Sequence, residues 1–187
     1  IAKRLSKKHE IHFFGMKFWS GEKIIQQEGI YYHGVCQPQA LYTGKNGQRS
    51  IKQALVFSAK LYRHLKKEKF DLIECCNFPY FPIFSCKLIS IIKKTPLNVT
   101  WHEVWDKYWF EYLGWKGIFG YLIERITSRL SKNNIVVSQD TQNKLAKISP
   151  HPSKLIPNGL ELNEIKKVKP SQEKFDVLFA GRLIKEK

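Results

Sequence analysis

The sequence has few acidic residues for its number of basic ones, and it lacks a long uncharged hydrophobic run. Its 16 Asp and Glu residues face 32 Lys and Arg residues, which gives a net charge of +16. A membrane-spanning helix needs about 18 or more apolar residues, and the nearest stretch, residues 78–92, is interrupted by Pro79, Pro82 and Lys87. No transmembrane helix is predicted. The charge suits an anionic partner, or it serves only solubility, because the lysines are spread along the whole chain.

The sequence also lacks the cysteine and histidine spacing of a metal site. Its four cysteines, Cys36, Cys75, Cys76 and Cys86, form no CxxC pair. Cys75 and Cys76 are neighbours in an expected strand, so their side chains point to opposite faces. Buried free thiols of this kind are typical of a reducing compartment. We therefore expect no metal and a cytoplasmic protein, either free or peripherally bound at the inner face of the membrane.

What the sequence does contain is an alternation of short apolar segments with amphipathic ones. With 43% hydrophobic residues, the chain has enough apolar material for one full core. Strands are expected at residues 10–15, within 23–35, and at 70–76, 96–101, 134–138 and 154–157. Helices are expected at 50–67, 81–94 and 139–148, with a loop and then a helix in 105–130. This order predicts right-handed βαβ units and a Rossmann-like, doubly wound parallel sheet.

The two ends of the chain suggest further domain organisation. Residues 1–9 have the pattern of the second half of a helix, so we expect the first strand of the domain to be missing. Residues 1–162 are expected to form this domain, and the charged segment 163–174 a linker. Residues 175–180 are expected to be the first strand of a second domain, truncated at residue 187.

Two amphipathic stretches are the candidates for contact with an anionic membrane. In the first, Ser50 is expected to cap a helix, whose apolar face carries Ile51, Ala54, Leu55, Leu61, Tyr62 and Leu65. Packing on the sheet explains that face more simply. The second stretch, residues 105–123, is rich in aromatic residues with Lys107 and Lys116 among them. For it, an internal covering loop and peripheral contact with lipid are equal alternatives.

Polar residues that follow the strands are the candidates for a ligand site, because parallel sheets bind ligands at the carboxyl ends of their strands. His102 can hydrogen-bond a sugar hydroxyl, and Glu103 can hold its tautomer or bind another hydroxyl. A loop histidine satisfied by local backbone is the simpler alternative. Ser138 is interpreted first as an N-cap and second as a residue lining a cleft. No GxSxG motif surrounds Ser138 to make it a nucleophile.

The last two candidates contain glycine. Asn158 and Gly159 are expected to form a tight turn, with Gly159 at positive φ and its backbone open to a ligand. Gly181 follows an expected strand and permits close approach of the backbone. Arg182 offers a planar fork of donors for phosphate oxygens, and Lys187 adds a second cation. Two cations there would stabilise a diphosphate leaving group.

Four segments in order, WHEVW, NIVVSQDTQNKL, KLIPNGLE and DVLFAGRLIKEK, resemble the retaining GT-B glycosyltransferases of family four over residues 101–187. The resemblance implies transfer of a sugar from a nucleotide-sugar donor to an acceptor hydroxyl, with retention of configuration and with no metal or other cofactor. It implies that His102 lies near the donor sugar and that Arg182 and Lys187 bind the donor diphosphate. It also implies an N-terminal domain that binds the acceptor, a glycan or a lipid-linked molecule.

The sequence departs from this family pattern at both ends. The N-terminal strand with its Gly-rich loop and most of the donor domain are absent, so the 187-residue chain is expected to be inactive alone. Two alternatives remain: a basic nucleic-acid-binding module and a non-catalytic Rossmann-like remnant. The first is disfavoured because no RRM, KH or helix-turn-helix signature is present and the lysines are not clustered. We therefore expect no nucleic-acid partner.

Overall fold

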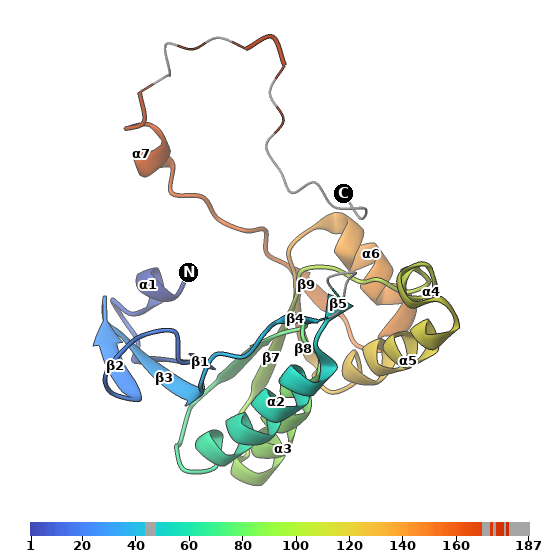
Figure 1. Ribbon diagram of the computed structural model, residues 1–187, viewed down its shortest axis with the longest axis horizontal. Coiled ribbons are helices and arrows are strands. Elements are labelled where there is room, and N and C mark those ends of the chain that lie inside the picture. Colours follow the sequence, from blue (N-terminus) through green and yellow to red (C-terminus); the bar gives the residue numbers. More distant parts are fainter. Residues whose placement is uncertain (44–47, 170–172, 174, 178, 180–187) are drawn as a thin grey trace.

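The strands of the protein fall into two main sheets, described in a computed structural model that covers residues 1–43, 48–169, 173, 175–177 and 179 (Figure 1). A three-stranded sheet has the order β1-β3-β2, with β1 and β3 parallel and β2 antiparallel. A four-stranded sheet has the order β6-β7-β8-β9 and is entirely parallel. The strands are β1 (Ile11–Met16), β2 (Ile24–Gln27), β3 (Ile30–Cys36), β6 (Ile73–Cys76), β7 (Leu97–Trp101), β8 (Asn133–Val136) and β9 (Ser153–Leu155), with β4 (Tyr42–Thr43) and β5 (Gln48–Arg49) as a small hairpin.

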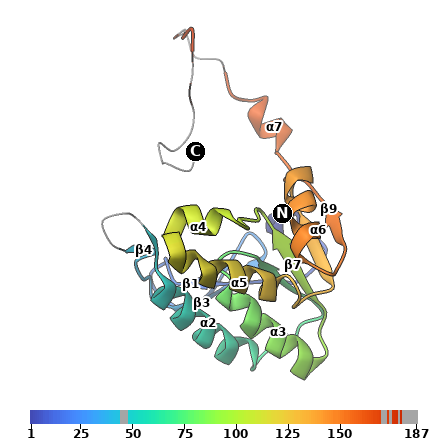
Figure 2. The same ribbon diagram turned by 90° about the vertical axis from the view of Figure 1, so that its right-hand side faces the viewer.

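Helices connect the parallel strands, as the sequence predicts for a mixed α/β fold. They are α1 (Ala2–Leu5), α2 (Ile51–Leu65), α3 (Phe81–Lys93), α4 (Tyr108–Leu113), the 3₁₀ turn η1 (Gly114–Lys116), α5 (Gly117–Thr127), α6 (Gln139–Ile148) and α7 (Leu162–Ile165). Figure 2 shows α2, α3, α4 and α5 together on one side of the four-stranded sheet. The expected parallel Rossmann-like arrangement is confirmed in this sheet. The N-terminal strands form a separate, mixed sheet.

The core lies between the four-stranded sheet and these helices. In β7, Leu97, Val99 and Trp101 alternate with partly exposed residues and are buried. Alternation of this kind places one face of the strand against the helices. Ile83 and Ile89 of α3 are completely buried against the same cluster. This packing fixes the end of β7, where the candidate site begins.

The buried face of α2 differs in part from the one that the sequence predicts. Ser50 caps the helix as expected, since its Oγ accepts a hydrogen bond from Gln53 N at 3.2 Å. Ile51 and Leu55, however, are exposed, so the expectation that they belong to the buried face is wrong. The reason is that α2 packs on α3 through small residues, with Ser58 Oγ 2.8 Å from Ser85 Oγ. The buried face of α2 consists of Gln53, Ala54, Ser58, Leu61 and Leu65, and the two aliphatic side chains lie outside it.

Two glycines bring α5 unusually close to α4. A Cβ atom on Gly117 would lie 2.2 Å from the carbonyl oxygen of Trp109, and one on Gly120 would lie 2.3 Å from the Trp109 ring. A larger side chain at either position would collide with α4. The glycines therefore allow Trp109 to be buried between the two helices.

The cysteines and the C-terminal segment depart in part from what the sequence predicts. All four cysteines are free, but Cys76 is exposed, so the expectation of buried thiols is wrong there. Residues 175–177 and 179 do not lie in a strand, and the helix α7 falls at the start of the expected linker. Gly181, Arg182 and Lys187 lie outside the described residues. Among the described helices, none has the length and apolar character needed to cross a bilayer.

Candidate functional site

The loop that follows β7 begins with two exposed ionisable side chains, His102 and Glu103. β7 pairs in parallel with β8, with Trp101 opposite Val136, so the carboxyl ends of both strands meet at one edge. Ser138 and the first turn of α6 follow β8 at that edge. The structure thus brings His102, Glu103 and Ser138 to the same edge of the sheet, as the sequence predicts.

Asn77, at the end of the neighbouring strand β6, holds the backbone of this loop. Its side chain is 1% exposed. The amide oxygen accepts a hydrogen bond from His102 N at 3.1 Å, and the amide nitrogen donates to the carbonyl of Glu103 at 3.1 Å. One buried side chain therefore satisfies both a donor and an acceptor of the loop. The backbone at His102 and Glu103 is fixed while their side chains stay accessible.

The start of α6 supports the loop from the other side. Thr141 Oγ1 donates a hydrogen bond to the carbonyl of His102 at 3.2 Å. Ser138 Oγ accepts from Thr141 N at 3.1 Å, which confirms Ser138 as the N-cap of α6. The cap fixes the helix terminus that presents Thr141 to the loop. A role of Ser138 in lining a cleft stays a prediction.

A buried carboxylate, Glu124 of α5, anchors the far end of the loop. It is 0% exposed. Its Oε1 accepts hydrogen bonds from Tyr80 Oη at 2.7 Å and Trp105 N at 2.9 Å, and its Oε2 accepts from Asp106 N at 2.8 Å. Burial, together with the negative charge of Glu124, raises the pKa of Tyr80 well above its usual value. Tyr80 therefore remains a hydrogen-bond donor to the carboxylate.

Stacked aromatic rings fill the space beneath the loop. Trp105 lies 6.0 Å from Phe78 in a stacked arrangement and 4.6 Å from Trp109, measured between ring centroids. Tyr112 meets Trp105 edge-on at 5.2 Å. These residues supply internal packing, which accounts for part of the aromatic density between residues 105 and 112. Trp115 and Phe119, farther along the chain, are 75% and 69% exposed.

Asn158 and Gly159 lie in an extended segment after β9. Residues 156–160 contain no turn, and Gly159 does not have a positive φ, so both of these expectations are wrong. A Cβ atom on Gly159 would lie 4.0 Å from Arg4 Nη1 of α1. Arg4 Nη2 in turn pairs with Glu161 Oε2 at 2.5 Å. This ion pair connects the segment to α1 in place of a local turn. The cleft-lining role of Asn158 and Gly159 stays a prediction.

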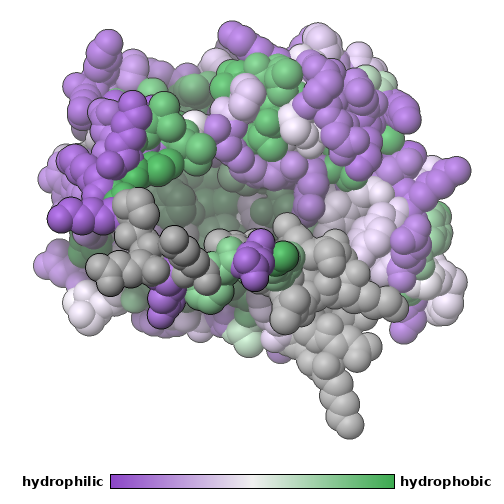
Figure 3. All heavy atoms as spheres, turned by 90° about the horizontal axis from the view of Figure 1, so that it is seen from above, coloured by the Kyte–Doolittle hydropathy of each residue, from purple (hydrophilic) through white to green (hydrophobic). Residues whose placement is uncertain are grey.

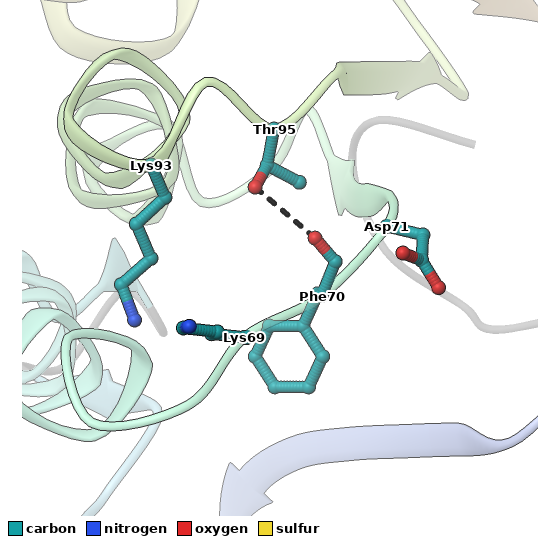
Figure 4. A pocket seen from close by; sticks show the side chains of 5 residues that line it. All are labelled: Lys69, Phe70, Asp71, Lys93 and Thr95. Carbon is teal, nitrogen blue, oxygen red and sulfur yellow. Dashed lines mark hydrogen bonds between the residues drawn. The ribbon is translucent and has the colours of Figure 1, made fainter.

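The face of the molecule seen from above is hollowed, and hydrophobic side chains line the hollow (Figure 3). It lies in the middle part of the molecule, where Figure 1 places the upper ends of the four-stranded sheet. A separate pocket of about 410 Å³ is lined by Lys69, Phe70, Asp71, Lys93 and Thr95 (Figure 4).

This separate pocket is not the site predicted from the sequence. Phe70 and Thr95 precede β6 and β7, so it lies at the amino edge of the sheet, away from His102. Thr95 Oγ1 donates to the carbonyl of Phe70 at 3.1 Å. Lys93 Nζ donates to the carbonyls of Leu65, at 3.0 Å, and Glu68. The polar side chains of this pocket thus donate to backbone carbonyls at and after the end of α2, where the helix leaves its carbonyls without partners.

The side chains at the carboxyl edge can exchange hydrogen bonds with a ligand. The imidazole of His102 can donate and accept a hydrogen bond, and the carboxylate of Glu103 can accept two. Within the described residues, no three His, Cys, Asp or Glu side chains are grouped as a metal site requires. The sequence pattern points to His102, Glu103 and Ser138. It assigns no role to Asn77, Thr141 or Glu124, which hold them in place.

A parallel sheet flanked by helices, with polar side chains gathered where adjacent strands end, is the arrangement of a Rossmann-like domain. The family model for Glycosyltransferase Family 4 matches residues 1–164. The chain therefore belongs to Glycosyltransferase Family 4, as its resemblance to family-four enzymes implies. A search of curated proteins gave no match.

Proposed function

We propose that this chain is the acceptor-side domain of a retaining GT-B glycosyltransferase. The enzyme would transfer a hexose from a nucleotide-sugar to a hydroxyl of a glycan or a lipid-linked acceptor. The observation that supports this proposal best is the loop with His102 and Glu103, which is anchored by buried side chains at both ends. Exposed polar groups on a fixed backbone suit recognition of a sugar, because little ordering is needed on binding.

In the proposed reaction, the bond between the anomeric carbon and the diphosphate oxygen breaks as the acceptor oxygen forms a bond on the same face. The acceptor proton passes to the departing phosphate oxygen. His102 hydrogen-bonds a hydroxyl of the donor sugar, and Glu103 orients the imidazole or binds a second hydroxyl. Arg182 and Lys187, with the backbone of Gly181, would stabilise the diphosphate, and no metal is needed for this step. The acceptor would bind to the N-terminal domain, and Ser138, Asn158 and Gly159 would line the cleft.

The test is a screen of UDP-, GDP-, ADP- and dTDP-sugars with saccharide and lipid-linked acceptors, followed by NMR of the product anomer. It is run on the 187-residue chain and on any longer product of the same gene. We expect transfer with retained configuration by an intact enzyme and no turnover by the 187 residues alone. Turnover by the short chain would contradict the second expectation. Inversion at the anomeric carbon would contradict the retaining mechanism.

A further inference from the structure

The helices on one side of the four-stranded sheet carry large apolar side chains on their outer sides. On α3 these are Phe84, Leu88, Ile91 and Ile92, and on η1 and α5 they are Trp115, Phe119, Leu122 and Ile126. We call these eight residues the outer apolar surface. A helix that is apolar on both its inner and its outer side is ordinarily covered on both. An exposed set of this size marks an interaction site.

On each helix, the residues of the outer apolar surface lie opposite the buried side. In α5 the buried residues are Gly117, Gly120, Glu124 and Thr127. Phe119, Leu122 and Ile126 recur at the same helical spacing on the other side of the cylinder. Because α3 links β6 to β7 and the α4–α5 segment links β7 to β8, right-handed crossovers place both helices on one face of the sheet. Their outer sides therefore point away from the sheet together.

The exposed charges of α2, α3 and α5 all have one sign, whereas α4 on the same side of the sheet adds the exposed Glu111. Across residues 51–67, 81–94 and 117–129, all of them described, the only acidic side chain is Glu124, which is 0% exposed. The outer side of α2 and the turn after it are basic instead, with exposed Lys52, Lys60, Arg63, Lys66 and Lys67. Lys94 follows α3, and Lys116 Nζ lies 5.8 Å from the ring centre of Trp115. Apolar stripes bordered by cations complement an anionic lipid surface.

We propose that the outer apolar surface docks on a bilayer containing anionic phospholipid, with the cations of α2 and α3 facing the headgroups. A second copy of the chain is a poorer occupant, because two surfaces with the same positive charge repel each other. Nucleic acid is a poorer occupant as well, because phosphate contacts would leave the apolar stripes in water. The proposed docking differs from insertion, because none of the described helices is long and apolar enough to cross a bilayer.

The docked orientation would bring the candidate site close to the lipid. Helix α3 begins after β6 and α4 begins after β7, so both start at the edge of the sheet that carries His102. Phe84 lies in the first turn of α3. An acceptor held in the membrane could then reach the site without leaving it. The docking itself needs neither donor nor acceptor, so it can be tested apart from the proposed reaction.

The test is co-sedimentation of the 187-residue chain with vesicles of phosphatidylcholine alone or mixed with phosphatidylglycerol. We expect binding to the mixed vesicles and much weaker binding to the neutral ones. The double variant Phe119→Ser, Leu122→Ser should lower the partition coefficient by about tenfold or more. Its matched control is Phe18→Ser, since Phe18 is 70% exposed and lies between β1 and β2. Binding that is equal in the variant and the control would overturn the proposal.

A second pair of variants tests the charges. Replacing Lys52, Arg63 and Lys67 by Gln should weaken binding to the mixed vesicles by about a hundredfold. The same change at Lys154, Lys166 and Lys167 serves as the control and should have little effect. Equal losses in the two triple variants would show general attraction only and would overturn the assigned surface. Self-association in solution, or a gel shift with DNA, that is abolished by the Phe119 and Leu122 variant would overturn it in favour of those partners.

Discussion

The four-stranded sheet and the three-stranded sheet are stabilised in different ways. Every member of the large buried cluster except Val35 comes from residues 61–148, around the four-stranded sheet and its helices. The three-stranded sheet instead has stacked rings, with His12 on Tyr31 at 4.9 Å and Phe14 on His33 at 4.4 Å. A site with fixed geometry therefore needs the support of the four-stranded sheet. The loop of His102 rests on the part of the molecule that is held by apolar burial.

The largest expected effect is the loss of Trp101 from the four-stranded sheet. Trp101 is 0% exposed, and its Nε1 donates to Asn134 Oδ1 at 3.0 Å. Trp101→Ala should lower the free energy of unfolding by about 3–5 kcal/mol because it leaves a cavity and an unpaired amide. Urea denaturation measures the change. Phe13→Ala, at a residue 52% exposed in β1, should cost no more than about 1 kcal/mol. Equal losses of unfolding free energy in the two variants would contradict the difference between the two sheets.

The next effect concerns the packing of α5 on α4. A Gly→Ala change inside an ordinary helix stabilises it by up to about 1 kcal/mol. Gly117→Ala should instead destabilise the protein by about 1–3 kcal/mol, because the new Cβ meets the backbone of Trp109. Thermal unfolding shows the sign. A stabilised variant would mean that α4 and α5 do not pack as closely as described.

An effect of similar size is expected at the carboxylate that anchors the site loop. Glu124→Gln keeps the shape but replaces one acceptor by a donor facing backbone N–H groups. It should cost about 1–3 kcal/mol and speed hydrogen exchange at the amides of Trp105 and Asp106. Glu111→Gln, at an exposed position of α4, is the matched control. Unchanged exchange in the Glu124 variant would remove the basis for a rigid loop.

The smallest effect should appear only in the three-stranded sheet, as a dependence on pH. His12 links Glu10 and His33, with its Nδ1 2.8 Å from His33 Nε2 and its Nε2 2.8 Å from Glu10 Oε1. Burial, and then the charge of His12 and of His64, lowers the pKa of His33 below its usual value, and Glu68 opposes this shift. The unfolded chain therefore takes up the proton first. This contribution to stability is complete above the ordinary histidine pKa and is lost as pH falls through the lowered one.

Hydrogen exchange of the β1 and β3 amides between about pH 8 and about pH 5 checks this expectation. The amides of β7 and β8 should show no matching loss of protection. His33→Phe should remove the dependence, since a phenyl ring can still stack on Phe14. If the pH dependence persists in that variant, His33 is not its source.

The sequence predicted elements whose signals are local. The helix at residues 139–148 has the expected bounds, and Ser50 and Ser138 cap their helices, because capping depends on a few neighbouring residues. The short apolar segments between amphipathic ones likewise located the strands of the parallel sheet. The position of His102 and Glu103 at the end of β7 followed from the same pattern.

Features that depend on distant partners could not be predicted in this way. Glu124 is a lone acid in an apolar helix, and only the fold shows that it accepts bonds from Tyr80 and the backbone at residues 105 and 106. Gly159 lies in a segment without a turn, and nearby Glu161 pairs with Arg4 of the distant helix α1. The exposure of Ile51 and Leu55 depends on how closely α2 approaches α3. Sequence periodicity alone carries none of this information.

The central claim is that His102, on its anchored loop, acts in sugar transfer. It is tested most directly by kcat/KM for transfer in the active enzyme with His102→Ala, compared with His9→Ala. Both residues are exposed, so neither change should alter the free energy of unfolding. The account predicts a loss of about 100-fold for His102→Ala, the scale of one lost transition-state contact, and no loss for His9→Ala. Equal activity of the two variants would contradict it.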